Sequence, residues 1–241
     1  MPRLPEPLVW LTRPAGENER LAEVLAASGV ATASVPCVRI AALDDPRSLR
    51  EAVLALGADD VLVLTSQAGV RAVAEAIGTR RCAAGIAAIG VATADACRAL
   101  GLPVTFTASR PTGAALGAEL PLPARNVLLA RADRAGDELP LLLRARGATV
   151  GEIGAYRTVP IAPLRAPDAD VVVFASPSAV DGFASGVALG AARAVVIGPT
   201  TAARVRERLG TEPVVAAHPA EQALAAAVRA ALEERHVTAR R

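Results

Sequence analysis

Hydroxyl side chains and glycines cluster where several apolar runs of this sequence end. A hydroxyl can donate and accept hydrogen bonds, and a glycine lets the backbone approach a ligand closely. Where parallel strands end and helices begin, such groups can bind carboxylates or phosphates. The same residue types are ordinary helix N-caps worth about 1 kcal/mol each, so no single one indicates a binding site. The candidates for substrate binding are Thr12, Ser66, Gly90, Thr93, Ser176, Ser178, Gly198, Thr200 and Thr201.

Two arginines and one tyrosine complete the set of candidate site residues. Arg13 and Arg131 follow the first strand of two repeated segments, and a guanidinium fork suits a carboxylate. Each arginine could bind such a group or be solvated beside a helix start. Tyr156 is the only tyrosine. Its phenol, with an ordinary pKa of about 10, stays protonated at neutral pH and can donate a hydrogen bond. The alternative is an amphipathic side chain that packs at a domain edge.

The composition excludes several other kinds of chemistry. The sequence has no lysine, so arginines and backbone N–H groups must meet any acidic ligand. Its three cysteines form no C-x-x-C pair, and it has only two histidines, so we expect no metal and no cofactor. The apolar stretches are interrupted by Arg and Pro, and the first eleven residues lack the apolar run of a signal peptide. These features predict a soluble, cytoplasmic protein that does not bind membranes. The net charge of +2 and the scarcity of aromatic residues argue against nucleic acid.

Internal repeats indicate the elements that position these residues. A short unit reads as strand and amphipathic helix, and a long unit reads as three strands that alternate with helices. The strands are continuous apolar runs, typical of a parallel sheet covered on both faces. We therefore predict α/β domains with flavodoxin-like, doubly wound sheets. The matching segments are Leu8–Thr32 with Asn126–Val150, Val61–Val73 with Val171–Phe183, and Ala88–Val104 with Val196–Val214.

The order of the repeats is short, long, short, long, and one unit of each length supplies the five strands of one sheet. Periodicity does not say which short unit joins which long one. Sequential domains would comprise residues 1–120 and 121–241. In the crossed-over alternative, the outer segments form one domain and the middle of the chain forms the other.

The ordered set of motifs resembles the uroporphyrinogen-III synthase family from end to end. The motifs are Thr12-Arg13-Pro14, Thr65-Ser66, Tyr156-Arg157, Ser176-Pro177-Ser178-Ala179-Val180 and Gly198-Pro199-Thr200-Thr201-Ala202. Gln67 departs from the family, which often has proline there. The resemblance implies the crossed-over arrangement, with two domains joined by a two-stranded extended linker. Domain one would be 1–36 with 160–241, domain two 40–155, and the linkers 36–40 and 154–160, which places Tyr156 between the domains.

The resemblance also implies the reaction. The family acts on hydroxymethylbilane, a linear tetrapyrrole with eight carboxylates, in the biosynthesis of heme, siroheme and cobalamin. Loss of the terminal hydroxyl gives an azafulvene, and ring D is inverted through a spiro intermediate as the macrocycle closes. We expect a cofactor-independent lyase that acts as a monomer, with Tyr156 as the catalytic residue. The alternatives are a non-catalytic regulatory relative that binds a tetrapyrrole or another anion, and a nucleotide-dependent enzyme, for which the phosphate-binding glycine motifs are missing.

Overall fold

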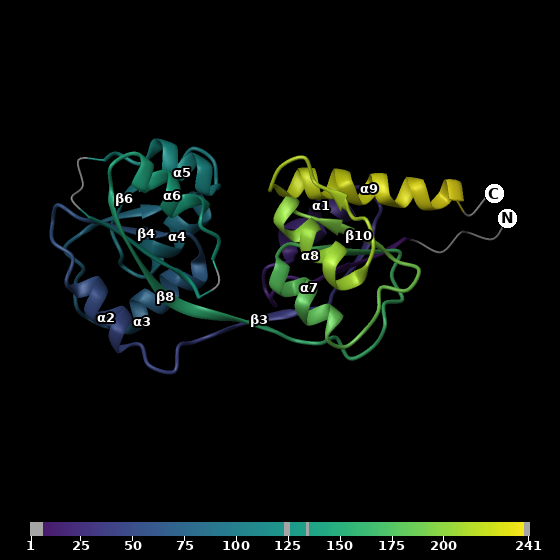
Figure 1. The fold of residues 1–241 in the computed structure, drawn as a ribbon, viewed down its shortest axis with the longest axis horizontal. Helices are drawn as coiled ribbons and strands as arrows, with labels where there is room; N and C mark the ends of the chain where they lie inside the picture. The colour runs from purple at the N-terminus through teal and green to yellow at the C-terminus, as the bar shows by residue number, and fades with distance from the viewer. Residues whose placement is uncertain (1–6, 123–125, 134, 239–241) are drawn as a thin grey trace. The chain divides into compact units, whose positions relative to one another are not determined.

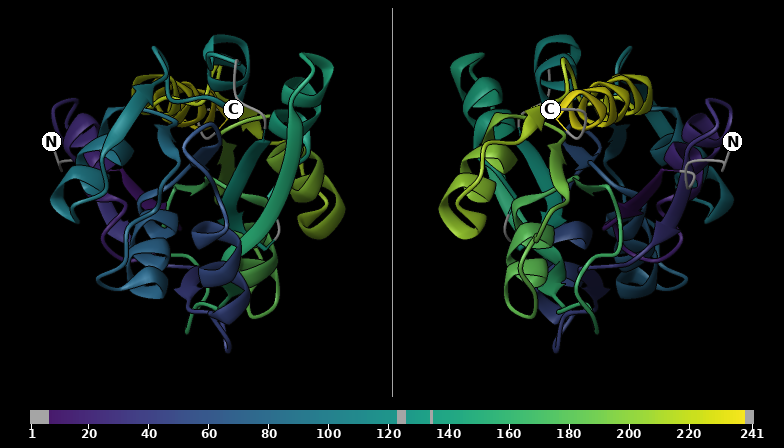
Figure 2. Two further views of the ribbon diagram at one scale, coloured as in Figure 1. Left: turned by 90° about the vertical axis from the view of Figure 1, so that its left-hand side faces the viewer. Right: turned by 90° about the vertical axis from the view of Figure 1, so that its right-hand side faces the viewer.

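Two predominantly parallel sheets, each flanked by helices on both faces, organise the chain (Figures 1 and 2). The structure, a computed structural model, describes residues 7–122, 126–133 and 135–238. It divides into two units. Unit 1 holds the described residues up to Arg39 and those from Val159 onward, and unit 2 is Ile40–Thr158. The chain passes between the units on β3 (Val38–Ala41) and on β8 (Thr149–Pro160), which are neighbours in one sheet.

Unit 1 has a five-stranded sheet of order β2-β1-β9-β10-β11, and every pair in it is parallel. Numbered by position along the chain, this order is 2-1-3-4-5, the flavodoxin-like arrangement. The strands are β1 (Leu8–Leu11), β2 (Ala31–Ser34), β9 (Val171–Phe174), β10 (Arg193–Val196) and β11 (Val214–Val215). The helices are α1 (Glu19–Ala26), α7 (Pro177–Ala184), α8 (Pro199–Leu209) and α9 (Glu221–Thr238).

Unit 2 has a six-stranded sheet of order β3-β8-β7-β4-β5-β6, in which β8 through β6 are parallel. It repeats the arrangement of unit 1 in permuted form. The β7–α6–β8 segment takes the place of β1–α1–β2 but comes last in the unit, whereas β1–α1–β2 comes first. Its other strands are β4 (Val61–Leu64), β5 (Gly85–Ala88), β6 (Val104–Thr107) and β7 (Asn126–Ala132). Its helices are α2 (Arg47–Leu54), α3 (Gln67–Ile77), α4 (Val91–Ala99), α5 (Gly113–Glu119) and α6 (Glu138–Ala145).

Alternating side chains of the strands build a core on each face of each sheet. In unit 1, Val9 and Val173 pack with α1 and α9, whereas Trp10 and Phe174 pack with α7 and α8. In unit 2, one face packs against α2, α3 and α4, and the other against α5 and α6. Because both faces are buried, the strands read as unbroken apolar runs. The predicted fold class is thereby confirmed.

Helix α7 lies against the backbone of both connecting segments. A Cβ atom added to Gly182 would lie 1.9 Å from the Cys37 carbonyl oxygen and 2.9 Å from the Ile161 nitrogen. The Ile161 N–H donates to the same Cys37 carbonyl at 2.9 Å. One turn later, a Cβ on Gly186 would lie 2.6 Å from that of Ala162. Gly182 in α7 and Gly186 just after the helix therefore let the two segments pass directly over it.

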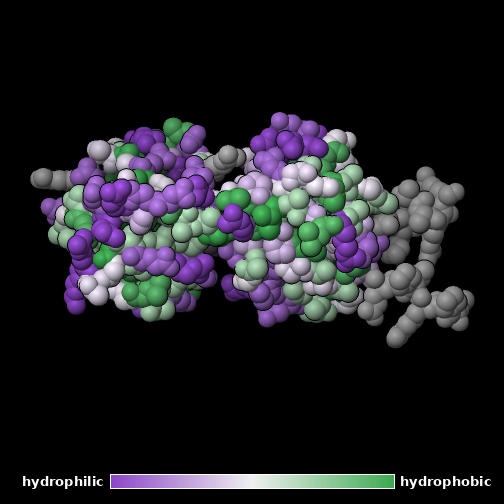
Figure 3. Space-filling view, turned by 90° about the horizontal axis from the view of Figure 1, so that it is seen from below, coloured by the Kyte–Doolittle hydropathy of each residue, from purple (hydrophilic) through white to green (hydrophobic). Residues whose placement is uncertain are grey.

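The surface mixes polar and apolar residues. On the face drawn in Figure 3, hydrophobic patches are interspersed with hydrophilic ones. None of the helices in the described ranges combines the length and the apolar character needed to cross a membrane. The last helix, α9, continues through Thr238, and residues 239–241 lie outside the described residues, as do residues 1–6.

Candidate functional site

Ser66 and Tyr156 meet at the carboxyl end of the unit 2 sheet. Ser66 follows β4 in an extended conformation and caps α3, its Oγ accepting the Gly69 N–H at 3.0 Å. The Tyr156 hydroxyl lies 3.0 Å from the same Oγ, and either oxygen can be the donor. A Cβ on Gly69 would lie 3.8 Å from the Tyr156 ring, so the small residue leaves room for the phenol.

Tyr156 lies on β8, the strand on which the chain passes between the units, and it belongs to unit 2. It lies on β8 in register with Ala132 of β7, just after a register shift. Its ring packs in the core formed with α3, and only 9% of the residue is exposed. Extended linkers and β-strands have the same local sequence character, so pairing with β7 could not be read from residues 154–160 alone.

A pocket of about 270 Å³ borders Tyr156 within unit 2. Its walls come from the segment after β3, from α2 and α3, and from Ala155 and Tyr156 on β8. Most lining residues are apolar, and the charged ones are Arg71 and Glu75 of α3. Ligand sites commonly combine an apolar wall with a few polar groups in this way. Neither charged residue was among the predicted site residues, although their spacing of four on a predicted helix places them on one face.

Gly90 and Thr93, the other predicted residues of this sheet edge, are packed inside unit 2. Gly90 precedes α4, and a Cβ there would lie 2.8 Å from Cβ of Pro111. Thr93 is 5% exposed within α4. The close contact with Pro111 explains the glycine by packing, without a ligand.

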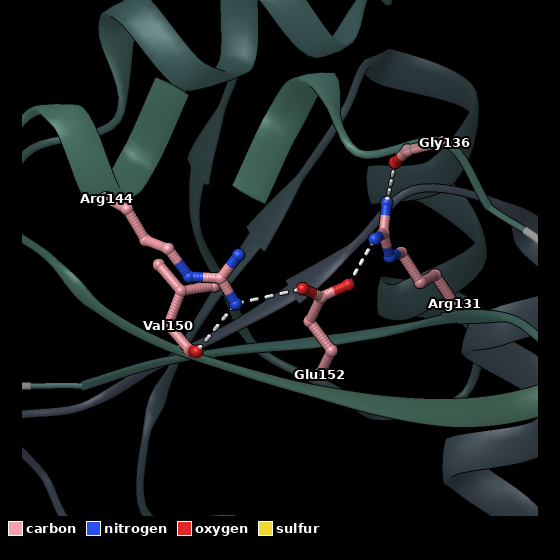
Figure 4. Close-up of polar contacts among 5 residues, drawn as sticks. All are labelled: Arg131, Gly136, Arg144, Val150 and Glu152. Atoms are coloured by element: carbon pink, nitrogen blue, oxygen red, sulfur yellow. Dashed lines mark hydrogen bonds and ion pairs between the residues drawn. The ribbon is translucent and has the colours of Figure 1, made fainter. Parts of the chain in front are cut away.

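Arg131 is held inside a hydrogen-bonded network (Figure 4). One guanidinium nitrogen donates to the Gly136 carbonyl at 2.5 Å, and another pairs with the Glu152 carboxylate. The other Glu152 oxygen accepts from Arg144 at 3.0 Å. Burial by itself would raise the pKa of the Glu152 carboxyl, but the hydrogen bonds and charges of the two arginines outweigh it and lower that pKa. Arg131 thus ties the loop after β7 to β8, and a substrate carboxylate would have to displace Glu152.

Arg13 of unit 1 has an equivalent arrangement. It pairs with Glu221 at 2.7 Å and donates to the Glu17 carbonyl at 3.4 Å. Both repeat-related arginines therefore bond a carbonyl of the loop that follows them and a glutamate from another element. Neither offers an uncompensated guanidinium to a ligand.

The hydroxyls of unit 1 divide into buried and accessible ones. Thr12 is fully buried, and its hydroxyl donates to the Val173 carbonyl at 2.6 Å, a bond that ties β1 to β9. Thr201 is 2% exposed within α8. Ser176 caps α7 by accepting the Ala179 N–H at 3.2 Å and stays half-buried, as does Ser178. Thr200 is exposed at the start of α8.

Gly198 differs from its repeat counterpart Gly90. It precedes α8 in an extended conformation, and a Cβ placed on it would meet nothing within 4 Å. Packing within unit 1 does not require a glycine here. Open space beside a helix start suits the approach of a ligand to backbone N–H groups.

The cysteines are poor candidates for a nucleophile. Burial raises the pKa of the Cys37 thiol to about 12 and that of Cys97 to about 11. Both thiols are therefore protonated at neutral pH, which suppresses their nucleophilicity. Among the residues that the structure describes, no group of three or more His, Cys, Asp and Glu could hold a metal ion.

Comparison with known proteins gives a family and a fold. The family model described as uroporphyrinogen-III synthase HemD matches residues 19–226. A mutant uroporphyrinogen III synthase from the extremely thermophilic bacterium Thermus thermophilus is similar at 20% identity and a TM-score of 0.56, over 94% of this chain and 99% of that one. The uroporphyrinogen-III synthetase from Helicobacter pylori is similar at 18% identity and a TM-score of 0.61, over 95% and 99%. These two likenesses show the fold alone. No curated protein sequence matches the chain.

Proposed function

We propose that this chain, which belongs to the uroporphyrinogen-III synthase family, cyclises hydroxymethylbilane with loss of water and inversion of ring D. The family match spans residues 19–226, which include Ser66, Tyr156, Ser176, Ser178, Thr200 and Thr201. As a working picture, the enzyme is a cytoplasmic monomer that needs no cofactor and contributes to tetrapyrrole biosynthesis.

The contact between Ser66 and Tyr156 carries the mechanistic part of the proposal. A phenol held by a helix-capping serine has a fixed direction and a dissociable proton. In the first step, the electron pair of the pyrrole nitrogen expels the terminal hydroxyl. The C–O bond breaks as Tyr156 gives its proton to the leaving oxygen, which departs as water. The pyrrole nitrogen loses its N–H proton, which returns to the tyrosinate directly or through solvent, and an azafulvene remains. A positioned donor of this kind typically contributes about 10²–10⁴-fold, and we expect the low end because the azafulvene forms readily.

In the remaining steps the enzyme must mainly hold the bilane in the right conformation, because no further group has to be activated. The substituted carbon of ring D attacks the azafulvene, and the spiro intermediate fragments and closes again at the other carbon. The bilane must stay curled meanwhile, and holding reactants in place can contribute up to roughly 7–11 kcal/mol. The accessible groups of unit 1, Ser176, Ser178, Gly198 and Thr200, lie where helices begin and are suited to binding carboxylates.

A single assay tests the proposal. Purified protein is mixed with freshly made hydroxymethylbilane, and the products are oxidised and separated into type III and type I isomers. We expect type III in excess over the type I that forms spontaneously. Saturable binding of the bilane with only type I product would contradict the proposal and favour a non-catalytic regulatory relative instead.

A further inference from the structure

We propose that the pocket beside Tyr156 receives one pyrrole ring of the substrate and that Arg71 binds a carboxylate on that ring. The inference rests on the proposed function for the identity of the ligand. Its structural basis is the meeting, within unit 2, of an apolar wall, a phenol and a guanidinium.

The volume of the pocket matches one ring of the bilane. Pockets that enclose drug-sized ligands span about 300–1,000 Å³, and a dry cavity of about 150 Å³ is enough for benzene. The volume of about 270 Å³ beside Tyr156 lies between the two. A single five-membered ring with its acetate and propionate fits this range, whereas a tetrapyrrole exceeds it. The rest of the bilane must therefore lie outside this pocket.

Arg71 is suited to recognise the acidic side chains of such a ring. Within the described part of the chain, its guanidinium makes no hydrogen bond and no ion pair. Arg13 and Arg131, by contrast, are each occupied by a glutamate. A carboxylate that reaches Arg71 displaces only water, and the planar fork can bind it through two hydrogen bonds.

Glu75 supplies an internal control for this assignment. It lies one helical turn after Arg71 on α3 and lines the same pocket. A carboxylate ligand is attracted by Arg71 and repelled by Glu75. Removing the charge of Arg71 must therefore weaken ligand binding, and removing that of Glu75 must strengthen it. If the two residues only stabilised α3, both substitutions would change ligand affinity in the same direction.

The single tyrosine makes the pocket directly observable. Protein labelled with ¹³C-tyrosine gives ring signals from Tyr156 alone. The probe is a monopyrrole that carries one acetate and one propionate. Wild-type protein and the variants Arg71→Gln, Arg71→Lys, Glu75→Gln and Arg80→Gln are titrated with it, and their KM and kcat for hydroxymethylbilane are measured. Arg80 is the matched control, because this arginine lines a different cavity of unit 2 and its guanidinium also lacks a partner among the described residues.

We expect the probe to shift the Tyr156 signals. Arg71→Gln should weaken probe binding and raise KM by about threefold to tenfold with little change in kcat, the range of an exposed charge-assisted contact. Arg71→Lys should restore only part of the affinity, because lysine keeps the charge and loses the fork. Glu75→Gln should strengthen binding, and Arg80→Gln should change neither the affinity for the probe nor KM. The Arg71 effect should shrink as salt is raised.

The outcomes separate this inference from the proposed function. Tyr156 signals that do not move at saturating probe, or an affinity that Arg71→Gln leaves unchanged, would overturn the inference even if type III product forms. If the probe binds in a way that depends on Arg71 but no type III product forms, the proposed function would be overturned. The pocket would still be a binding site for a pyrrole ring with its carboxylates. If unit 2 of Arg71→Gln does not fold, as judged by circular dichroism and by the Tyr156 ring signals, the opposite effect of Glu75→Gln still decides.

Discussion

The Tyr156 hydroxyl lies 3.0 Å from Oγ of Ser66, although ninety residues separate them in the chain. The serine also accepts an N–H at the start of α3. One side chain thus joins the helix to β8 and fixes the direction of the phenol. This double role makes the contribution of each hydroxyl measurable by removing it alone.

Replacing Tyr156 by phenylalanine should slow type III formation by about 10²-fold or less, because the leaving oxygen loses its hydrogen-bond donor. The ring stays in the core, so the free energy of unfolding should fall by only about 1 kcal/mol. Initial rates of type III formation and urea unfolding of the same preparation measure both effects. An unchanged rate would mean that Tyr156 contributes only packing in the core and takes no part in the reaction.

Ser66→Ala should lose both the cap of α3 and the partner of Tyr156. We expect a destabilisation of about 1 kcal/mol and a lower rate. The matched control is Thr112→Ala, because Thr112 caps α5 of the same unit by accepting the Ala115 N–H at 3.1 Å. The control should lose similar stability and keep its rate. Equal losses of rate in the two variants would show that capping alone accounts for the effect of Ser66.

The repeats made much of the fold predictable. Each long unit, read from its apolar runs, predicted three strands that alternate with helices, and the structure has β4, β5 and β6 in one copy and β9, β10 and β11 in the other. The choice of partner was not predictable from periodicity, because the pairing of β1 with β9 depends on contacts far apart in sequence. Family resemblance had to supply the crossed-over arrangement.

The candidate site was less predictable than the fold. The types and spacing of Ser66 and Tyr156 suggested chemistry, but only the structure brings their oxygens together. Arg13 and Arg131 were predicted as ligands for carboxylates, and the structure places a glutamate on each. Sequence alone could not reveal these partners, since Glu221 lies 208 residues after Arg13. Thr12 resembled an accessible hydroxyl and proved fully buried.

The glycines at two equivalent helix starts should respond differently to alanine. Gly90→Ala forces Pro111 to move, which should cost about 1–3 kcal/mol of stability. Gly198→Ala adds a methyl group to open space in an extended conformation, so its melting temperature should match that of the wild type. If a substrate carboxylate approaches the backbone at Gly198, this variant should show a raised KM. A melting temperature lowered as far as that of Gly90→Ala would contradict the structural account.

Glu152 should make folding stability depend on pH. Its pKa is lowered in the folded protein, so its contribution is complete above the ordinary value of 4.5 and is lost as the pH falls through the lowered value. Glu152→Gln should therefore be less stable than the wild type at pH 7, and the difference should shrink below about pH 4.5. Urea unfolding of both proteins across this range measures it. If the difference in the free energy of unfolding does not depend on pH, the charge of Glu152 does not stabilise the protein through Arg131 and Arg144.

The permuted order of unit 2 has a consequence for how the chain folds. Unit 1 cannot complete its sheet until β9 is made, and the Leu8 N–H donates to Asp170, 162 residues later in the chain. Unit 2 has all of its strands within one continuous segment, so during synthesis it can fold first. Once it has folded, β3 and β8 lie side by side and bring the flanking segments together. Folded unit 2 then connects β1 and β9 as a short loop would. Most of the conformational entropy that pairing these two strands costs has already been lost when unit 2 folds. Folding of unit 2 should therefore speed the assembly of unit 1, whose two segments lie before and after unit 2 in the chain.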